Sequence, residues 1–173
     1  VEGCETEGVD GLHVLQAADD DWIVLPVMCR TVGSQTAAVT VKRAVPDMDF
    51  VVEQGNRLWG CKGDTIYASK LGDFRNWNSF AGLSTDSYAA SRGSDGVFTG
   101  AAACMGGVIF FKEDCMERVY PSAAGAHQIV TVRCPGIRKG CGGSAALVDG
   151  TLFYVGVNGV YAFDGSMPVC VSR

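Results

Sequence analysis

Apolar and polar residues alternate along much of the chain with a period of two, which is the pattern of β-strands with one buried face. The pattern is clearest from Phe50 onward, where short apolar runs are separated by turns that contain glycine. Earlier in the chain, residues 22–27 form an apolar run that contains Pro26, and residues 37–45 alternate. Because proline has no backbone N–H, we expect residues 22–27 to form an edge strand or a bulge, and residues 37–45 to form a strand with one buried face.

A pattern of three strands recurs three times in the second part of the chain. In each copy, an apolar strand is followed by a glycine turn, a second apolar strand, a second turn and a third strand that closes on a tyrosine. The closing tyrosines are Tyr67, Tyr120 and Tyr161. They are 53 and 41 residues apart, which is close to the ~40–50 residues of a propeller blade.

The turns within these copies indicate tight hairpins. The turn pairs are Gln54-Gly55, Asp149-Gly150 and Asn158-Gly159. Each pair places glycine where a two-residue hairpin turn needs a positive φ. Each copy is therefore predicted to be a three- or four-stranded antiparallel meander, which cannot bury both faces alone and must stack on its neighbours around an axis or in a row. The predicted fold class is all-β, with repeated antiparallel β-meanders in a partial or small β-propeller; a β-sandwich with irregular hairpins is the alternative.

These patterns divide the chain into a lead-in and three repeats. Residues 1–45 are expected to be a lead-in segment or a partial blade, and residues 46–173 to be three blade-like β repeats. The repeats cover about 46–95, 96–140 and 141–173. In the linker after the first copy, residues 84–92 are expected to form a turn or two of helix. Because the chain begins at Val1 without a signal-peptide pattern, we expect it to be a fragment or a processed piece of a longer protein.

The composition agrees with short strands and many turns. The chain has 23 glycines but only 5 prolines, and 47% of its residues are hydrophobic, which is enough to bury a core. The net charge of −5 disfavours direct nucleic-acid binding, because that binding requires clustered Lys and Arg. No stretch approaches the ~20 apolar residues of a membrane span, so we expect no membrane partner.

The residues that often carry chemistry do not form recognisable motifs. The eight cysteines lack the spacing of zinc sites, and we expect mostly free, buried thiols, with disulfides and a metal site as alternatives. His13 and His127 lie in polar, turn-like segments without a nucleophile motif. The acidic residues that are hydrolase candidates by type alone are Asp47, Asp49, Glu113, Asp114 and Glu117. We therefore predict a protein that is not an enzyme, with no catalytic, cofactor-binding or metal-binding residues and no cofactor.

Two segments resemble a pattern found in β-propeller proteins of tailed phages and prophages. The first is Asn-Arg-Leu-Trp-Gly at residues 56–60, with Ile-Tyr-Ala-Ser and Leu-Gly-Asp before an Asn-Trp pair within residues 63–77. The second is Gly-Val-Tyr-Ala-Phe-Asp-Gly at residues 159–165, followed by Pro168. The similar proteins are head-to-tail adaptor, tail-nozzle and packaged-DNA stabilisation components, and the resemblance covers roughly residues 46–173.

The resemblance implies a non-catalytic structural or assembly module of a virion, in the tail or the head-to-tail connector region. Its partners would be other virion proteins, reached through loops such as residues 71–95, and it would be assembled in the cytoplasm of the bacterial host. Known propellers have more blades than three, so we expect this chain to pack with further chain or to self-associate as a homo-oligomer. The alternative is a carbohydrate-binding or host-recognition propeller domain, in which Trp59, Trp77 and Tyr154 would line an open face.

Overall fold

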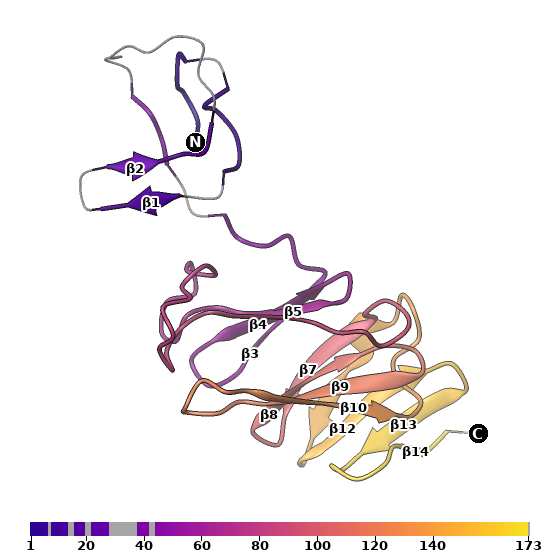
Figure 1. Ribbon diagram of the computed structural model, residues 1–173. Helices are drawn as coiled ribbons and strands as arrows, with labels where there is room; N and C mark the ends of the chain where they lie inside the picture. Colours follow the sequence, from indigo (N-terminus) through magenta and orange to yellow (C-terminus); the bar gives the residue numbers. More distant parts are fainter. Residues whose placement is uncertain (7, 14–15, 20–21, 28–37, 42–43, 173) are drawn as a thin grey trace. The chain divides into compact units, whose positions relative to one another are not determined.

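The protein consists almost entirely of β-strands and turns (Figure 1). The computed structural model describes residues 1–6, 8–13, 16–19, 22–27, 38–41 and 44–172. The chain divides into two compact units, Val1–Ala44 and Val45–Arg173. In these described residues, the regular structure is antiparallel strand with one short 3₁₀ turn, η1 (Gly142–Ser144), which confirms the all-β class. Within the described ranges, no helix is long and apolar enough to cross a membrane.

The first unit has little regular structure in its described residues. β1 (Ala17–Ala18) pairs with β2 (Ile23–Val24), so the strand expected over residues 22–27 forms at two residues only. The strand expected over residues 37–45 is wrong where the structure describes it, since Thr40 alone makes a bridge there. Residues 37, 42 and 43 lie outside the described residues. An alternating segment forms a strand when a partner sheet covers its apolar face, and none of the described residues of this unit is buried.

The second unit contains three four-stranded antiparallel sheets, and in each sheet the strands follow one another in sequence order. The first sheet comprises β3 (Phe50–Glu53), β4 (Leu58–Lys62), β5 (Thr65–Ala68) and β6 (Tyr88–Ser91). The second sheet comprises β7 (Gly100–Cys104), β8 (Gly107–Phe111), β9 (Cys115–Tyr120) and β10 (Gln128–Arg133). The third sheet comprises β11 (Ala146–Val148), β12 (Thr151–Gly156), β13 (Gly159–Phe163) and β14 (Val169–Cys170). The predicted repetition of antiparallel meanders is therefore confirmed.

The fourth strand of the first sheet lies where we expected helix. Residues 84–92 contain β6 instead of a helical turn. Tyr88 pairs with Ala68 and Ala90 pairs with Ile66, so both side chains share the face of β5 that is buried. The helix expectation is wrong because the alternation in this short segment is stabilised by pairing with β5, which is distant in the sequence.

The third strand of each sheet gives the period of the repeat. The first residues of β5, β9 and β13 are 50 and 44 residues apart. Tyr67 and Tyr161 each occupy the third position of their strand, whereas the third position of β9 is Glu117. Tyr120 is the last residue of β9 and is 42% exposed. The alignment of Tyr120 with the other two tyrosines is therefore wrong, although the repeat itself is present.

Positive φ angles occur at the tight turns where glycine predicted them. At the β11–β12 turn, Asp149 (φ 46°) and Gly150 (φ 79°) are the central residues, as expected for a type I′ hairpin. At the β3–β4 turn, the central residues are Gly55 (φ 63°) and Asn56 (φ 56°), one residue later than predicted. The β12–β13 turn lies one residue earlier than predicted. Glycine thus located all three hairpins and gave the correct register for the β11–β12 turn alone.

The three sheets stack through two hydrophobic cores. One core lies between the first and second sheets, and the other lies between the second and third sheets. All of β8 is buried: Val108 and Phe110 enter the first core, and Ile109 and Phe111 enter the second. The first strands of the first two sheets, β3 and β7, lie close together. The middle sheet thus buries both of its faces, which is how a repeated sheet protein builds its core.

Candidate functional site: the β5–β6 loop

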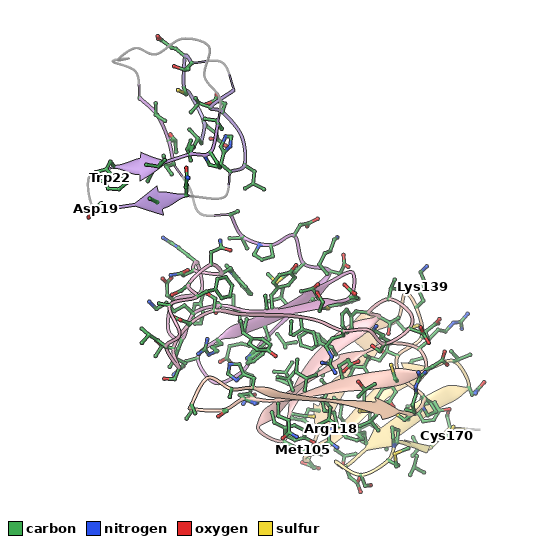
Figure 2. The ribbon with its side chains drawn as sticks, in the orientation of Figure 1. Asp19, Trp22, Met105, Arg118, Lys139 and Cys170 are labelled. Carbon is green, nitrogen blue, oxygen red and sulfur yellow. The ribbon has the colours of Figure 1, made fainter. Side chains whose placement is uncertain are left out.

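The β5–β6 loop, residues 69–87, connects two neighbouring strands of the first sheet. Long connections without their own helix or strand are uncommon in compact domains and are often functional. The loop overlaps most of residues 71–95, the linker that the sequence analysis expected to contact other proteins. Its side chains are drawn in Figure 2. Two buried polar residues, Arg57 and Asp86, hold its backbone in place.

Arg57 fastens the ends of the β5–β6 loop to the first sheet. It immediately precedes β4, and its side chain is 4% exposed. Its Nη1 donates hydrogen bonds to the carbonyl oxygens of Ser69 (2.7 Å) and Asp86 (2.5 Å), and its Nη2 donates to that of Ser84 (2.8 Å). Burial lowers the pKa of Arg57, and the charge of Asp86 partly offsets this. Because the acceptors lie at both ends of the loop, one guanidinium closes it.

The carboxylate of Asp86 organises the second half of the loop. It accepts hydrogen bonds from the backbone N–H of Leu83 (2.9 Å) and from the hydroxyl of Ser79 (2.9 Å). These bonds lower the pKa of Asp86, the Leu83 N–H being the largest cause. The hydroxyl of Ser87 donates to the carbonyl of Asn76 at 2.9 Å and links this half to the first. A short acidic side chain that binds nearby backbone N–H groups in this way stabilises a turn.

Trp77 anchors the first half of the loop. Its side chain is 3% exposed, and its Nε1 donates to the carbonyl oxygen of Phe74 at 2.9 Å. The backbone N–H of Leu71 donates to the carbonyl of Thr85 at 2.9 Å, which joins the two halves. The loop therefore has a fixed backbone although it contains no regular secondary structure.

Four large apolar side chains project from this backbone. Leu71, Phe74, Phe80 and Leu83 are 43%, 48%, 63% and 61% exposed, and we call them the apolar loop surface. Burial of such side chains stabilises a complex by roughly 25 cal/mol per Å² of apolar surface. A backbone that is already ordered lowers the entropy cost of binding. The arrangement can therefore bind an apolar protein surface.

The two histidines take part in separate local contacts. Nε2 of His13 donates to the carbonyl oxygen of Val9 at 2.8 Å. His127 lies edge-on to Trp59 and Tyr88, with ring centroids 5.0 Å from each. Its Nδ1 accepts a hydrogen bond from the backbone N–H of Ser122 at 3.0 Å, so this nitrogen carries no proton. Burial, with a smaller effect of the charge of Arg57, lowers the pKa of His127.

Glu117, one of the hydrolase candidates, has a fully buried side chain. Its carboxylate accepts hydrogen bonds from Nε of Arg92 (3.2 Å), the hydroxyl of Ser94 (2.6 Å) and the hydroxyl of Thr131 (2.9 Å). These donors come from β10 and from the connection between the first and second sheets. The geometry therefore gives Glu117 a role in fastening the connection between the first and second sheets to β9 and β10. In the sequence, Glu117 was visible only as an acidic residue in an apolar strand.

The other acidic candidates lie at the surface of the second unit. Asp47 and Asp49 pair with the ammonium group of Lys62 at 3.4 and 2.8 Å. Glu113 and Asp114 lie in the turn between β8 and β9. The structure thus places these carboxylates in an ion-pair cluster and in a turn, apart from the β5–β6 loop and from Glu117.

Six cysteines in the described part of the chain are free thiols: Cys61, Cys104, Cys115, Cys134, Cys141 and Cys170. Cys29 lies outside the described residues. Burial is the main cause that raises the pKa of Cys61 to about 12 and that of Cys134 to about 11, so both are protonated at neutral pH. The described residues contain no group of three His, Cys, Asp or Glu side chains arranged to hold a metal ion.

The rings that the glycan alternative would use are inside the protein. Trp59, Trp77 and Tyr154 are 0%, 3% and 1% exposed, so their faces are packed against other side chains. Buried aromatic rings contribute to packing and to the anchoring of loops. In comparisons with known proteins, no protein-family model matches this chain, and no curated protein sequence matches it.

Proposed function

We propose that the chain is a non-catalytic structural module of a tailed-phage or prophage particle, acting through protein–protein contacts in the tail or head-to-tail connector region. The resemblance of residues 56–60 and 63–77 to phage propeller proteins supports this proposal. The fold supports a propeller arrangement, since three consecutive meanders stack through both faces of the middle sheet. Closely placed first strands, as in β3 and β7, are what blades around an axis require.

The apolar loop surface is the observation that carries the contact function. An assembly protein must offer apolar side chains to a partner while its own fold stays ordered. The polar groups of Arg57, Asp86 and Trp77 form hydrogen bonds that hold the backbone of the β5–β6 loop. The large apolar side chains of the loop remain exposed. The carbohydrate-binding alternative receives no support from Trp59 and Tyr154, because both rings are buried. We therefore favour a contact module assembled with its particle in the host cytoplasm.

The test is incorporation into purified particles from the host that carries the gene. We expect mass spectrometry to find the wild-type chain in purified particles. The double substitution Phe80→Ser and Leu83→Ser should reduce its incorporation at least ~10-fold. Val97→Ser, which changes an apolar residue that is 57% exposed outside this loop, is the matched control and should be incorporated normally. Circular dichroism should show that both variants fold, because exposed substitutions change stability by about 0.5 kcal/mol or less.

Two results would contradict the proposal. Absence of the wild-type chain from particles would reject the virion role. Normal incorporation of the double variant would reject the apolar loop surface as the contact site. Specific binding of the chain to a glycan array, reduced by the same double variant, would favour the carbohydrate-binding alternative instead.

A further inference from the structure

The outer face of the third sheet is apolar. The register of β11 to β14 puts a set of small and branched side chains on the side opposite to Leu152, Tyr154, Tyr161 and Phe163, which enter the second core. This outer set includes Val148, Phe153, Val155, Val160, Ala162 and Val169. Val148 and Val169, at its two edges, are 53% and 63% exposed. A sheet of this kind normally packs its second apolar face against another sheet.

The outer face of the first sheet carries charged groups beside apolar side chains such as Val51 and Leu58. Glu53 and Lys62 lie on it, and the ammonium group of Lys62 is 2.8 Å from the Asp49 carboxylate. Met48 covers this face at its centre, since a Cβ on Gly60 would collide with the Met48 side chain. Charged groups and a covering segment of this kind are typical of the capping end of a repeat protein.

We infer that the outer face of the third sheet is a dimer interface, which packs against the same face of a second copy of this chain. The partner must offer an apolar sheet face. The three stacked sheets of the second unit have two outward faces, one on the first sheet and one on the third sheet. Stacking the third sheet on the first sheet of another copy would bury Asp49, Glu53 and Lys62 against valines, which costs free energy. Packing of the apolar face on its own copy avoids that cost.

The symmetry of this contact limits its size. A face that packs on itself forms a closed two-fold dimer, whereas stacking of the third sheet on the first sheet of another copy would close into a ring or continue into a filament. The charged outer face of the first sheet therefore takes no part in this contact, and the dimer contains six four-stranded sheets. The inference rests on the sheet stacking within the proposed function and is independent of the virion role.

Analytical ultracentrifugation of the full chain tests this inference. The wild-type protein should sediment as a dimer of the 18.2 kDa chain at ~100 µM, as expected for a dissociation constant in the micromolar range or tighter. Val169→Lys and Val148→Lys place charges at opposite edges of the interface, on the short edge strands β14 and β11, and each should raise the dissociation constant at least ~10-fold. Val51→Lys, on the outer face of the first sheet and 47% exposed, is the matched control and should remain dimeric.

Several outcomes would overturn the inference. A monomeric wild-type chain at ~100 µM would reject the interface. Dissociation caused by Val51→Lys but not by the edge variants would place a dimer contact on the first sheet. Larger species that grow with concentration would indicate filament stacking. Far-UV circular dichroism and unfolding curves identify any variant that fails to fold, and the second edge variant then decides the question. Failure of this test leaves particle incorporation through the β5–β6 loop unaffected, so the two proposals fail separately.

Discussion

The two junctions between the stacked sheets have different chemistry. At the first junction, between the first and second sheets, polar groups accompany the apolar core. Arg92, which follows the first sheet, pairs with the buried carboxylate of Glu117 in the second sheet at 3.2 Å. His127, from the loop that precedes β10, lies against Trp59 and Tyr88 of the first sheet. Each of these contacts joins a strand residue of one sheet to a residue of a connecting segment next to the other sheet.

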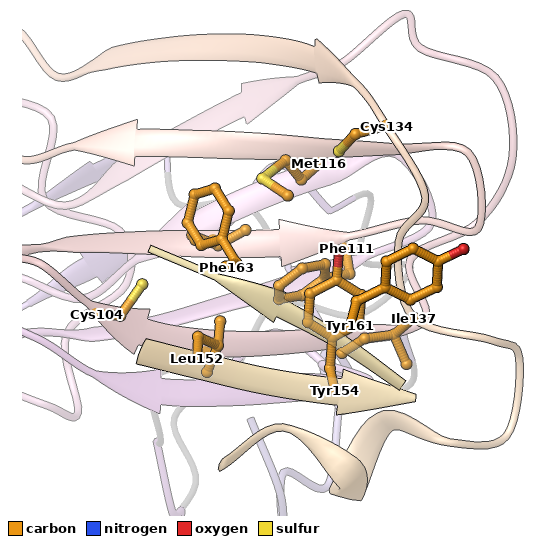
Figure 3. Close-up of a cluster of buried hydrophobic side chains, with 11 residues drawn as sticks. Cys104, Phe111, Met116, Cys134, Ile137, Leu152, Tyr154, Tyr161 and Phe163 are labelled. Carbon is orange, nitrogen blue, oxygen red and sulfur yellow. The ribbon is translucent and has the colours of Figure 1, made fainter. Parts of the chain in front are cut away.

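At the second junction, between the second and third sheets, the contact is built mainly from rings and aliphatic side chains (Figure 3). The ring centroids of Phe111 and Tyr154 are 4.9 Å apart, and Tyr154 stacks on Tyr161 at 5.7 Å. Arg118 crosses this junction and donates to the carbonyl oxygen of Gly165 at 2.9 Å. Rings and aliphatic side chains therefore make up most of the second junction, while the polar contacts of the first junction add directional constraints on its register.

Removal of a large buried ring should give the largest decrease in the free energy of unfolding. At the first junction, such a decrease would show that the junction depends on apolar packing as well as on its polar contacts. Trp59→Ala removes a fully buried side chain and should lower the free energy of unfolding by ~3–5 kcal/mol. Urea unfolding measures this change. Phe163→Ala, its counterpart at the second junction, should cost a similar amount. A shift of only a degree or two in the melting temperature of Trp59→Ala would show that Trp59 is not a core residue.

Removal of one charge should separate the two junctions. Glu117→Gln keeps the shape of the side chain but leaves Arg92 without its ionised partner, and it should lower the free energy of unfolding by ~2–3 kcal/mol. Asp95→Asn is the control, because Asp95 is 3.9 Å from Arg133 in an exposed ion pair that is worth about 1 kcal/mol or less. Equal losses in the two variants, measured by urea unfolding, would mean that burial of Glu117 adds nothing to the first junction.

Removal of a single buried hydroxyl at the second junction should give a smaller decrease in the free energy of unfolding. The hydroxyl of Tyr154 donates to the carbonyl oxygen of Pro135 at 2.6 Å, beneath the stacked rings. Tyr154→Phe removes this bond, keeps the ring and should lower the free energy of unfolding by ~1 kcal/mol. A loss as large as that of Glu117→Gln would show that the second junction also depends on buried polar contacts, which would break the contrast between the two.

The sequence predicted the parts of this fold that depend on local pattern. Alternation and glycine turns located the three meanders, because strand periodicity and positive φ are properties of neighbouring residues. The sequence did not predict that Glu117 occupies the strand position of Tyr67 and Tyr161, because this register follows from the length of the β8–β9 turn. The strand β6 and the absence of a strand over most of residues 38–41 depend on whether a partner sheet is present, which the local pattern does not encode.

The candidate site was predictable in place but not in construction. The linker of residues 71–95 was expected to contact partners because the resemblance to phage propeller proteins implies contacts through such loops. The β5–β6 loop lies mostly within this linker. The role of Arg57 in holding the loop could not be predicted, because its three acceptors are backbone carbonyl oxygens. Every residue has such an oxygen, so residue identity does not reveal the acceptors. The neutral state of His127 was equally hidden, since it follows from burial and from a backbone donor.

Protonation of His127 should cause the smallest change in the free energy of unfolding. We expect it to account for part of the loss of stability in acid, through the first junction. Burial and the charge of Arg57 lower the pKa of His127 in the folded protein. As the pH falls through about 6.5, His127 therefore becomes protonated in the unfolded chain while it is still neutral in the folded protein. Stability should therefore be complete above about pH 7 and should fall as the pH drops below about 6.5. His127→Gln removes this titration, so between about pH 7.5 and pH 5 it should lose less free energy of unfolding than the wild type. Equal losses of unfolding free energy in the wild type and His127→Gln would show that His127 does not cause the acid sensitivity. The ion pair of Glu117 would then be the polar contact that distinguishes the first junction from the second.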